Sequence, residues 1–253
     1  CNQGITILSK GGTAAFLVEA GVPFKEVSEV TRFPEMLDGR VKTLHPIIHA
    51  GILARRDNKE HLKVLKELQI TLIDYVVCNL YPFEKTIQKL NVNIEEVIEN
   101  IDIGGPTLIR AAAKNYKDVV VVTSPKQYPE IINLLKLKKE ISLRQREKLA
   151  IEAFAHTAQY DSIISQYLRN RWTDEILPQD YTVSLRKIQE MRYGENPHQK
   201  GAFYKALPLI REPCVSNVKQ LQGKELSFNN IVDANCAIEC IKEFSEPSCV
   251  IIK

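Results

Sequence analysis

The chain has 253 residues, of which 44% are hydrophobic and 26% are charged, so it can bury a sizeable core and belongs to neither the disordered nor the fibrous class. Its 34 basic and 31 acidic residues give a net charge of +3, which is too small for a general nucleic-acid surface but allows a local anion site. The sequence contains neither a membrane-spanning apolar run nor a secretory signal, and its six scattered cysteines indicate reduced thiols in the cytoplasm.

Apolar runs typical of buried strands alternate with helical patterns along most of the chain. The predicted strands cover residues 4–8, 23–27, 72–80 and 118–123. The predicted helices cover residues 11–21, 58–70, 94–101, 106–116, 125–137 and 142–172. This alternation predicts an α/β fold with a doubly wound, mostly parallel sheet, in which ligands bind beyond the carboxyl ends of the strands.

A second region follows a polar, proline-containing segment at residues 173–187, which we interpret as a linker or a domain boundary. Turn residues are concentrated at positions 191–199, and the segments at residues 202–207 and 226–244 come next, of which residues 233–244 have the pattern of one face of an amphipathic helix. The sequence stops at residues 249–253, which have the composition of a strand. We therefore expect the second region to be an incomplete domain.

The turn after the first predicted strand combines a cation with glycines. Lys10, Gly11, Gly12 and Thr13 lead directly into a predicted helix. Glycines let the backbone approach an anion, and the free N–H groups at a helix start attract phosphate. An ordinary strand-to-helix turn accounts for these residues equally well, and the spacing is not that of a Walker loop.

The segment at residues 38–51 suits three kinds of site. Its two histidines have the spacing of a metal-binding pair on a helix, but the glutamate of the metalloprotease pattern is missing. An arginine and a lysine at alternate positions would point to one side of an extended segment and could hold a phosphate or a carboxylate. A solvated basic loop is the third interpretation. The residues concerned are Arg40, Lys42, Thr43, His45 and His49.

A hydrogen-bonding amide and a phenol follow the third predicted strand. Asn79 and Tyr81, in the run from Cys78 to Phe83, would lie at the ligand-binding end of the sheet. The alternative is that the Tyr81 ring only covers the sheet core.

A second glycine turn opens the predicted helix at residues 106–116. Asp102 precedes Gly104 and Gly105, and the N–H groups of this turn could bind an anion or stabilise an oxyanion. Lys114 lies further along the same helix, where an ordinary surface lysine is the alternative. No nucleophile–base pair with a recognisable spacing is present in the sequence.

Several motifs, in this order, resemble the bifunctional purine-biosynthesis family that combines AICAR transformylase with IMP cyclohydrolase. The motifs are SEVTRFPEMLDGRVKTLHPIIHAGILARR, CNLYPF, IDIGGPTLIRAAAKN, AFAHTAQYD, MRYGENPHQ and LSFNNIVDANCA. The resemblance covers essentially the whole chain. It implies a methylglyoxal-synthase-like cyclohydrolase domain at residues 1–185, lacking its first strand, and the start of a cytidine-deaminase-like α/β transformylase domain at residues 186–253.

The implied reaction is the dehydrative ring closure of formyl-AICAR, a phosphorylated imidazole carboxamide ribonucleotide, to IMP. It requires a folded substrate, a stabilised oxyanion and proton transfer. The resemblance assigns catalysis to Lys42, Tyr81, Asp102 and Lys114. It assigns substrate binding to Lys10, Gly11, Gly12, Thr13, Arg40, Thr43, Cys78, Asn79, Ile103 and Gly104. It assigns part of the transformylase AICAR site to Arg192, Tyr193, Asn230 and Lys253.

The resemblance implies neither a metal nor a cofactor for ring closure, whereas the parent transformylase would use 10-formyl-tetrahydrofolate as co-substrate. The expected partners are a small nucleotide substrate and a second copy of the chain in a homodimer, with no nucleic acid and no membrane. His45 and His49 are then expected to be structural, as neutral rings that fix the turn around Pro46. The competing class is a nucleotide-binding regulatory module of the same fold without catalysis. Methylglyoxal synthase is a related alternative, but MRYGENPHQ would not follow it.

The sequence departs from the family pattern at three places. The family's N-terminal strand with its Ser/Lys loop is missing, and Lys10 occupies a position that is usually Ser or Thr. The chain also stops at Lys253, where the transformylase Lys-His motif begins. We therefore expect a fragment in which Lys10 contacts phosphate differently and which does not transfer formyl groups.

Overall fold

The chain forms two compact units, Cys1–Asp161 and Ser162–Lys253. The structure, a computed structural model, describes residues 4–37, 40–41, 43–208 and 212–253. The division into units falls within a long helix, whereas the sequence predicts a domain boundary between residues 185 and 186. That boundary stays a prediction.

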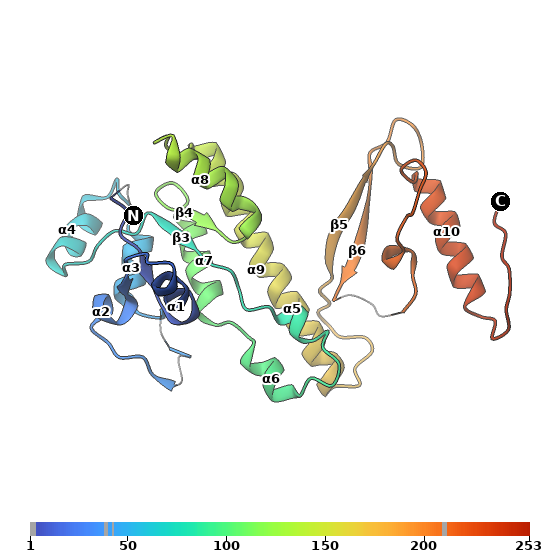
Figure 1. Cartoon of the computed structure of the whole chain (residues 1–253), viewed down its shortest axis with the longest axis horizontal. Coiled ribbons are helices and arrows are strands. Elements are labelled where there is room, and N and C mark those ends of the chain that lie inside the picture. The colour runs from blue at the N-terminus through green and yellow to red at the C-terminus, as the bar shows by residue number, and fades with distance from the viewer. Residues whose placement is uncertain (1–3, 38–39, 42, 209–211) are drawn as a thin grey trace. The chain divides into compact units, whose positions relative to one another are not determined.

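The first unit is an α/β arrangement in which every predicted helix is present (Figure 1). Its strands are β1 (Leu8–Ser9), β2 (Lys25–Glu26), β3 (Tyr75–Val77) and β4 (Val120–Val122). Its helices are α1 (Gly11–Glu19), α2 (Val27–Thr31), α3 (Pro46–Leu53), α4 (Lys59–Glu67), α5 (Phe83–Thr86), α6 (Ile94–Glu99), α7 (Gly104–Lys114), the 3-10 helix η2 (Pro125–Gln127), α8 (Tyr128–Lys136) and most of α9 (Leu143–Trp172).

The strands of this unit pair in parallel, as the sequence predicts. β1 pairs with β2, and β3 pairs with β4, so the described strands form two small parallel sheets. The first strand is shorter than predicted and begins later, at Leu8, although the Ile7 carbonyl already accepts a hydrogen bond from the Lys25 N–H (2.8 Å). The fold class is confirmed, with a smaller parallel ladder than the apolar runs alone indicate.

The core of the first unit lies around β4, whose three valines are all buried. A run with no exposed position requires cover on both faces of the strand. α7 packs against β3 and β4, and its Ile109 and Ala112 are fully buried. α3 and α9 add Ile52 and Ala153 to the same cluster. Burial of each large aliphatic side chain stabilises the fold by about 1.5–3 kcal/mol.

α3 was not among the predicted helices, although its first residues carry a helix start signal. His45 is the N-cap, and its Nδ1 accepts a hydrogen bond from the Ile47 N–H (3.2 Å). Pro46 occupies the first helical turn, where its missing N–H costs nothing. The predicted structural role of His45 is therefore confirmed.

His49 lies on the same helix and is partly buried. Burial lowers the pKa of His49, so the neutral ring is favoured. Its Nε2 atom has no hydrogen-bond partner among the described residues. Within the described ranges, no three His, Cys, Asp or Glu side chains are grouped closely enough to hold a metal ion.

The second unit contains the antiparallel pair β5 (Ser184–Met191) and β6 (Gly201–Leu207), the 3-10 helix η3 (Val215–Asn217) and α10 (Phe228–Ile241). β5 includes the last four residues of the segment predicted as a linker, so that prediction was wrong from residue 184 onward. Residues 249–253 are not a strand, contrary to their composition. A strand requires a hydrogen-bonded neighbour, and the described residues offer none there.

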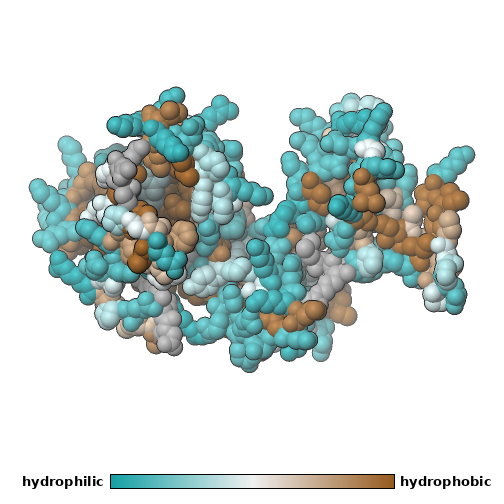
Figure 2. Space-filling view, in the orientation of Figure 1, coloured by the Kyte–Doolittle hydropathy of each residue, from teal (hydrophilic) through white to brown (hydrophobic). Residues whose placement is uncertain are grey.

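The surface in Figure 2 is largely hydrophilic, with separate apolar areas. In the second unit, four large apolar side chains are at least 85% exposed. They are Ile176, Leu177, Leu221 and Ile251. None of the described helices combines the length and the apolar character that crossing a membrane requires.

Candidate functional site

The N-terminus of α7 carries the carboxylate that the sequence singled out. Asp102 Oδ1 accepts a hydrogen bond from the Gly105 N–H (2.7 Å), so the side chain lies over the first turn of the helix. The positive end of the helix dipole stabilises a negative charge in this position. The carboxylate is only half-buried, so it can be reached by a ligand.

The glycines of this turn are required by close packing. A methyl group on Gly105 would overlap the Asp102 carboxylate and would lie 2.7 Å from Leu80 Cδ2. A methyl group on Gly104 would lie 2.9 Å from Thr43 Oγ1. The backbone of the turn can therefore approach both side chains only because neither residue has a Cβ atom.

Thr43, in the segment before α3, lies at the N-terminus of α7 beside Gly104. Its side chain is buried, and its Oγ1 has no hydrogen-bond partner among the described residues. A buried hydroxyl without a partner costs about 1–3 kcal/mol. A ligand oxygen or nitrogen at this helix end would recover that energy.

The thiol of Cys78, just after β3, is influenced by charged side chains from two other predicted segments. Burial raises the pKa of Cys78 to about 11, the Asp102 carboxylate adds to the rise, and the Lys10 ammonium opposes it. The packing around Gly105, whose Cβ position would be within 3 Å of both Leu80 and Asp102, places the segment after β3 beside the start of α7.

The glycine turn at β1 has the geometry of an anion-binding helix start. Gly11 has a φ of 54°, in the left-handed region that favours glycine. No atom lies within 4 Å of the Cβ position of Gly12, and the first turn of α1 contains no acidic residue. An anion at the N–H groups of Gly12 and Thr13 would meet the helix dipole without a competing carboxylate.

Beyond β3, the backbone N–H of Cys78 donates to the Val122 carbonyl (2.9 Å) and continues the parallel ladder. The amide of Asn79 then donates to the hydroxyl of Tyr128 (2.8 Å), the first residue of α8. This bond leaves the Asn79 oxygen available to accept from a ligand. Tyr81 is 52% exposed and lies at the same end of the strand.

Two predicted site residues stand apart from this convergence. Arg40 pairs with Glu99, and both side chains are more than half exposed, so the pair is weak and does not commit the guanidinium. Lys114 is at the far end of α7, about 15 Å from its start at 1.5 Å per residue. It lines an open groove of about 1040 Å³ with Arg110 and Phe154. Lys42 lies outside the described residues.

The predicted transformylase residues all lie in the second unit. Arg192 and Tyr193 follow β5, and Lys253 is exposed at the last position. Asn230 is on the first turn of α10, where it forms a capping box with Ser227: Asn230 Oδ1 accepts from the Ser227 N–H, and Ser227 Oγ accepts from the Asn230 N–H. That contact is a helix start, and it does not by itself indicate a ligand site.

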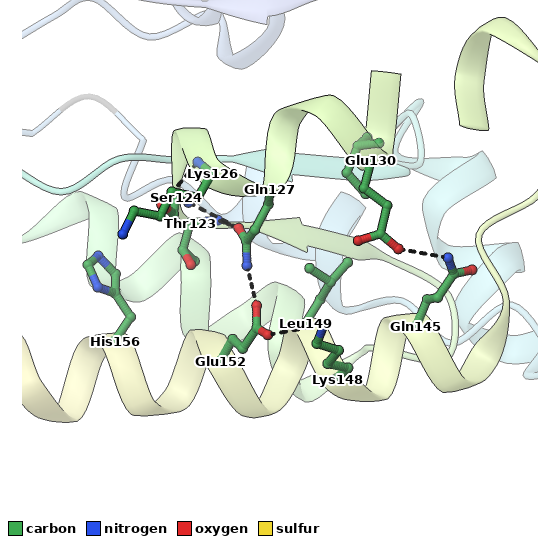
Figure 3. Close-up of a pocket in the computed structure, with 11 residues that line it drawn as sticks. Thr123, Ser124, Lys126, Gln127, Glu130, Gln145, Lys148, Leu149, Glu152 and His156 are labelled. Atoms are coloured by element: carbon green, nitrogen blue, oxygen red, sulfur yellow. Dashed lines mark hydrogen bonds and ion pairs between the residues drawn. The ribbon is translucent and has the colours of Figure 1, made fainter. Parts of the chain in front are cut away.

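A second cavity, which is polar and has a volume of about 430 Å³, lies beyond the carboxyl end of β4 (Figure 3). Gln127 is at its centre: the side-chain oxygen accepts from the N–H groups of Thr123 and Ser124, and the side-chain nitrogen donates to Glu152 (2.6 Å). Gln145 donates to Glu130 at the other end of the cavity (3.0 Å). These bonds connect the start of α8 to α9, so we assign this cavity a structural role.

Comparison with known proteins identifies the relatives of this chain. A sequence model described as the MGS-like domain matches residues 1–107, and one described as the AICARFT/IMPCHase bienzyme matches residues 112–253, which is more than half of the chain. The chain belongs to the AICARFT/IMPCHase bienzyme family. The resemblance drawn from the motifs is confirmed.

Curated relatives within the family carry the name bifunctional purine biosynthesis protein PurH. The protein from Acetivibrio thermocellus is 55% identical over 252 residues, and the one from Caldicellulosiruptor saccharolyticus is 52% identical over 253 residues. Each alignment covers 100% of this chain and 49% of the relative, so the chain spans about half the length of these relatives. The crystal structure of ForH covers 68% of this chain and 88% of its own, with a TM-score of 0.62 and 28% identity.

The first testable consequence concerns Gly105. Gly105→Ala is expected to lower the turnover of the proposed reaction about 100-fold, because the new methyl group displaces the Asp102 carboxylate. Gly104→Ala is the matched comparison: it meets only the Thr43 hydroxyl, which can rotate, and a smaller loss is expected. Steady-state kinetics of both variants measure the difference. Equal activity in the two variants would contradict this account of the turn.

The second consequence concerns Cys78. Because its pKa is raised from 9 to about 11, its thiolate fraction at pH 8 is about 100-fold lower than that of an unperturbed thiol. We expect iodoacetamide to modify the exposed Cys236 and Cys240 first, and the rate at Cys78 to keep rising until about pH 11. Mass spectrometry of labelled peptides over a pH series measures this. A rate at Cys78 that levels off near pH 9 would rule it out.

Proposed function

We propose that the chain closes the purine ring of formyl-AICAR to give IMP, with loss of water. The observation that carries the proposal is the N-terminus of α7, where Asp102 accepts from the Gly105 N–H and the buried Thr43 hydroxyl has no partner among the described residues. A cation for phosphate, a carboxylate for proton transfer and N–H groups for an oxyanion are the groups that ring closure requires. The membership of a family whose name includes IMP cyclohydrolase supports this choice.

In the proposed reaction, the carboxamide nitrogen of the substrate attacks the formyl carbon and forms a new C–N bond. Asp102 accepts the proton that the nitrogen loses. The formyl oxygen becomes a hydroxyl beside the N-terminus of α7 and leaves as water once it is protonated. We assign the remaining proton transfers and charge neutralisation to Lys42, Tyr81 and Lys114.

The proposed binding mode follows the same geometry. The turn at Lys10, Gly11, Gly12 and Thr13 holds the phosphate. Thr43 and Arg40 contact the phosphate or the ribose. The base lies against the carboxyl end of β3 and the start of α7, with contacts assigned to Cys78, Asn79, Ile103 and Gly104.

A regulatory module that binds a nucleotide without catalysis is the second candidate. The position of Lys114 favours it, because this lysine lies about a helix length from Asp102. An effector site would use the glycine turns and would not require Lys114 to approach them.

One assay distinguishes the two functions. The 253-residue chain is incubated with formyl-AICAR, and IMP formation is followed by ultraviolet absorbance against a blank without protein. Ring closure well above the blank supports the cyclohydrolase. Saturable binding of IMP in calorimetry without turnover would support the regulatory module instead, and the absence of both would rule out the site.

For the longer protein, we propose formyl transfer to AICAR with 10-formyl-tetrahydrofolate as co-substrate, with Arg192, Tyr193, Asn230 and Lys253 in the AICAR site. We also propose a cytoplasmic homodimer. The exposed apolar side chains of the second unit support further packing, because large apolar areas are usually covered. Sedimentation analysis of the longer protein tests the dimer, and a single monomeric species would contradict it.

A further inference from the structure

Tyr160, in the first part of α9, joins two backbone groups in front of α7. Its hydroxyl accepts a hydrogen bond from the Asp102 N–H (2.9 Å) and donates one to the Asn100 carbonyl (2.9 Å). The side chain is only 8% exposed. The phenol thus donates one hydrogen bond and accepts one, so its hydroxyl bridges the backbone of Asn100 and Asp102.

The hydroxyl keeps its proton in this position. Burial raises the pKa of Tyr160 to about 12, while the hydrogen bond from Asp102 opposes the rise. Below about pH 9 the phenol is therefore almost entirely neutral in both the folded and the unfolded chain. The Tyr160 hydroxyl can therefore donate to the Asn100 carbonyl over the whole pH range in which an enzyme of this kind is assayed.

The ring of Tyr160 supports the other catalytic segment. It meets the ring of Phe83 edge-on, with centroids 6.2 Å apart and an interplanar angle of 69°. Phe83 is 1% exposed, and its N–H donates to the Tyr81 carbonyl (2.8 Å). Edge-to-face pairs of this kind have a preferred geometry, so the ring restrains the turn that carries Tyr81.

Asp102 is consequently held at two points that come from different helices. Its side chain accepts from Gly105 on α7, and its backbone N–H donates to Tyr160 on α9. With only one of these bonds, the loop could still rotate about it, so a single bond would not fix the carboxylate. The hydroxyl of Tyr160 supplies the second fixed point.

We propose that Tyr160 is a positioning residue for ring closure, which sets the carboxylate of Asp102 through its hydroxyl and the turn of Tyr81 through its ring. This inference rests on the proposed function. It gives a role to Tyr160 in the AFAHTAQYD motif, which otherwise only marks the resemblance to the family.

The test is a double-mutant cycle in the 253-residue chain. Tyr160→Phe keeps the ring and removes the hydroxyl, and kcat is expected to fall about tenfold or more while KM changes little. In an Asp102→Asn background the same change is expected to have almost no effect, because the residue through which it acts is already altered. Tyr75→Phe, which removes a half-buried hydroxyl from β3, is the control and is expected to leave kcat unchanged.

Equal losses in both backgrounds would overturn the proposal, since they would show that Tyr160 does not act through Asp102. Failure of Tyr160→Phe to fold, judged by circular dichroism, would also overturn it, because the hydroxyl would then be a requirement of the fold.

Hydrogen exchange separates this inference from the proposed function. If the unaltered chain does not form IMP, the proposed function fails, and amide exchange of residues 100–105 still tests the positioning. Faster exchange in Tyr160→Phe, confined to this segment, is the expected result. Unchanged protection of the Asp102 and Gly105 amides would refute the role of the hydroxyl.

Discussion

Asp102→Asn is expected to lower kcat for ring closure about 1000-fold, which is within the range for loss of a general base. Asparagine keeps the shape of the side chain and an oxygen that can accept from the Gly105 N–H, so the start of α7 should be retained. What is lost is the negative charge and the ability to accept a proton. The variant therefore separates proton transfer from folding more cleanly than alanine would.

Steady-state kinetics on formyl-AICAR measure this effect, and urea unfolding verifies that the variant is folded. Asp57→Asn is the control, because Asp57 is an exposed carboxylate that pairs with Arg55 away from the site. We expect the control to retain full turnover. If Asp102→Asn stays within about twofold of the unaltered chain, Asp102 is not the base.

Gly51→Ala is expected to destabilise the fold by about 3 kcal/mol, at the upper end of the cost of overpacking a core. Gly51 lies in α3, and a methyl group there would be 2.6 Å from the Thr71 carbonyl oxygen. The Ile73 N–H also donates to the Gly51 carbonyl (3.0 Å), so the two segments cannot separate without breaking that bond. Because the obstacle is backbone, a change of rotamer cannot relieve it.

The free energy of unfolding from urea titration measures the loss. Gly12→Ala is the matched control, because no atom lies within 4 Å of its Cβ position and α1 gains helix propensity. We expect no loss of stability in the control. If the two variants have equal stability, α3 does not pack as closely against residues 71–73 as the structure indicates.

Six helices of the first unit could be predicted because their signals are local, whereas α2, α3 and α5 were missed. α7 illustrates this, since a glycine turn and an apolar repeat define it within a dozen residues. Strand lengths could not be predicted, because a strand exists only where a neighbour offers hydrogen bonds. β1 is therefore shorter than its apolar run, and residues 249–253 form no strand among the described residues in spite of their composition.

The candidate site could be predicted in part for a similar reason. Glycine turns and strand ends were sufficient to select Lys10 and Asp102 as candidates, because parallel strands bring their carboxyl ends together, whereas Cys78 was assigned only by resemblance. Tyr160 could not be assigned a role, since its contact with Asp102 joins positions 58 residues apart. Lys114 was assigned by resemblance, although the rise of a helix already places it far from Asp102.

The environment of Cys78 also determines how the site withstands oxidants. Peroxides react with thiolates, and a thiol whose pKa is about 11 is almost entirely protonated at neutral pH. The exposed Cys236, Cys240 and Cys249 are in more accessible positions on the second unit. A mild oxidant would therefore consume those surface thiols before it reacted with Cys78. The proposed site can contain a cysteine without becoming sensitive to the redox state of its surroundings.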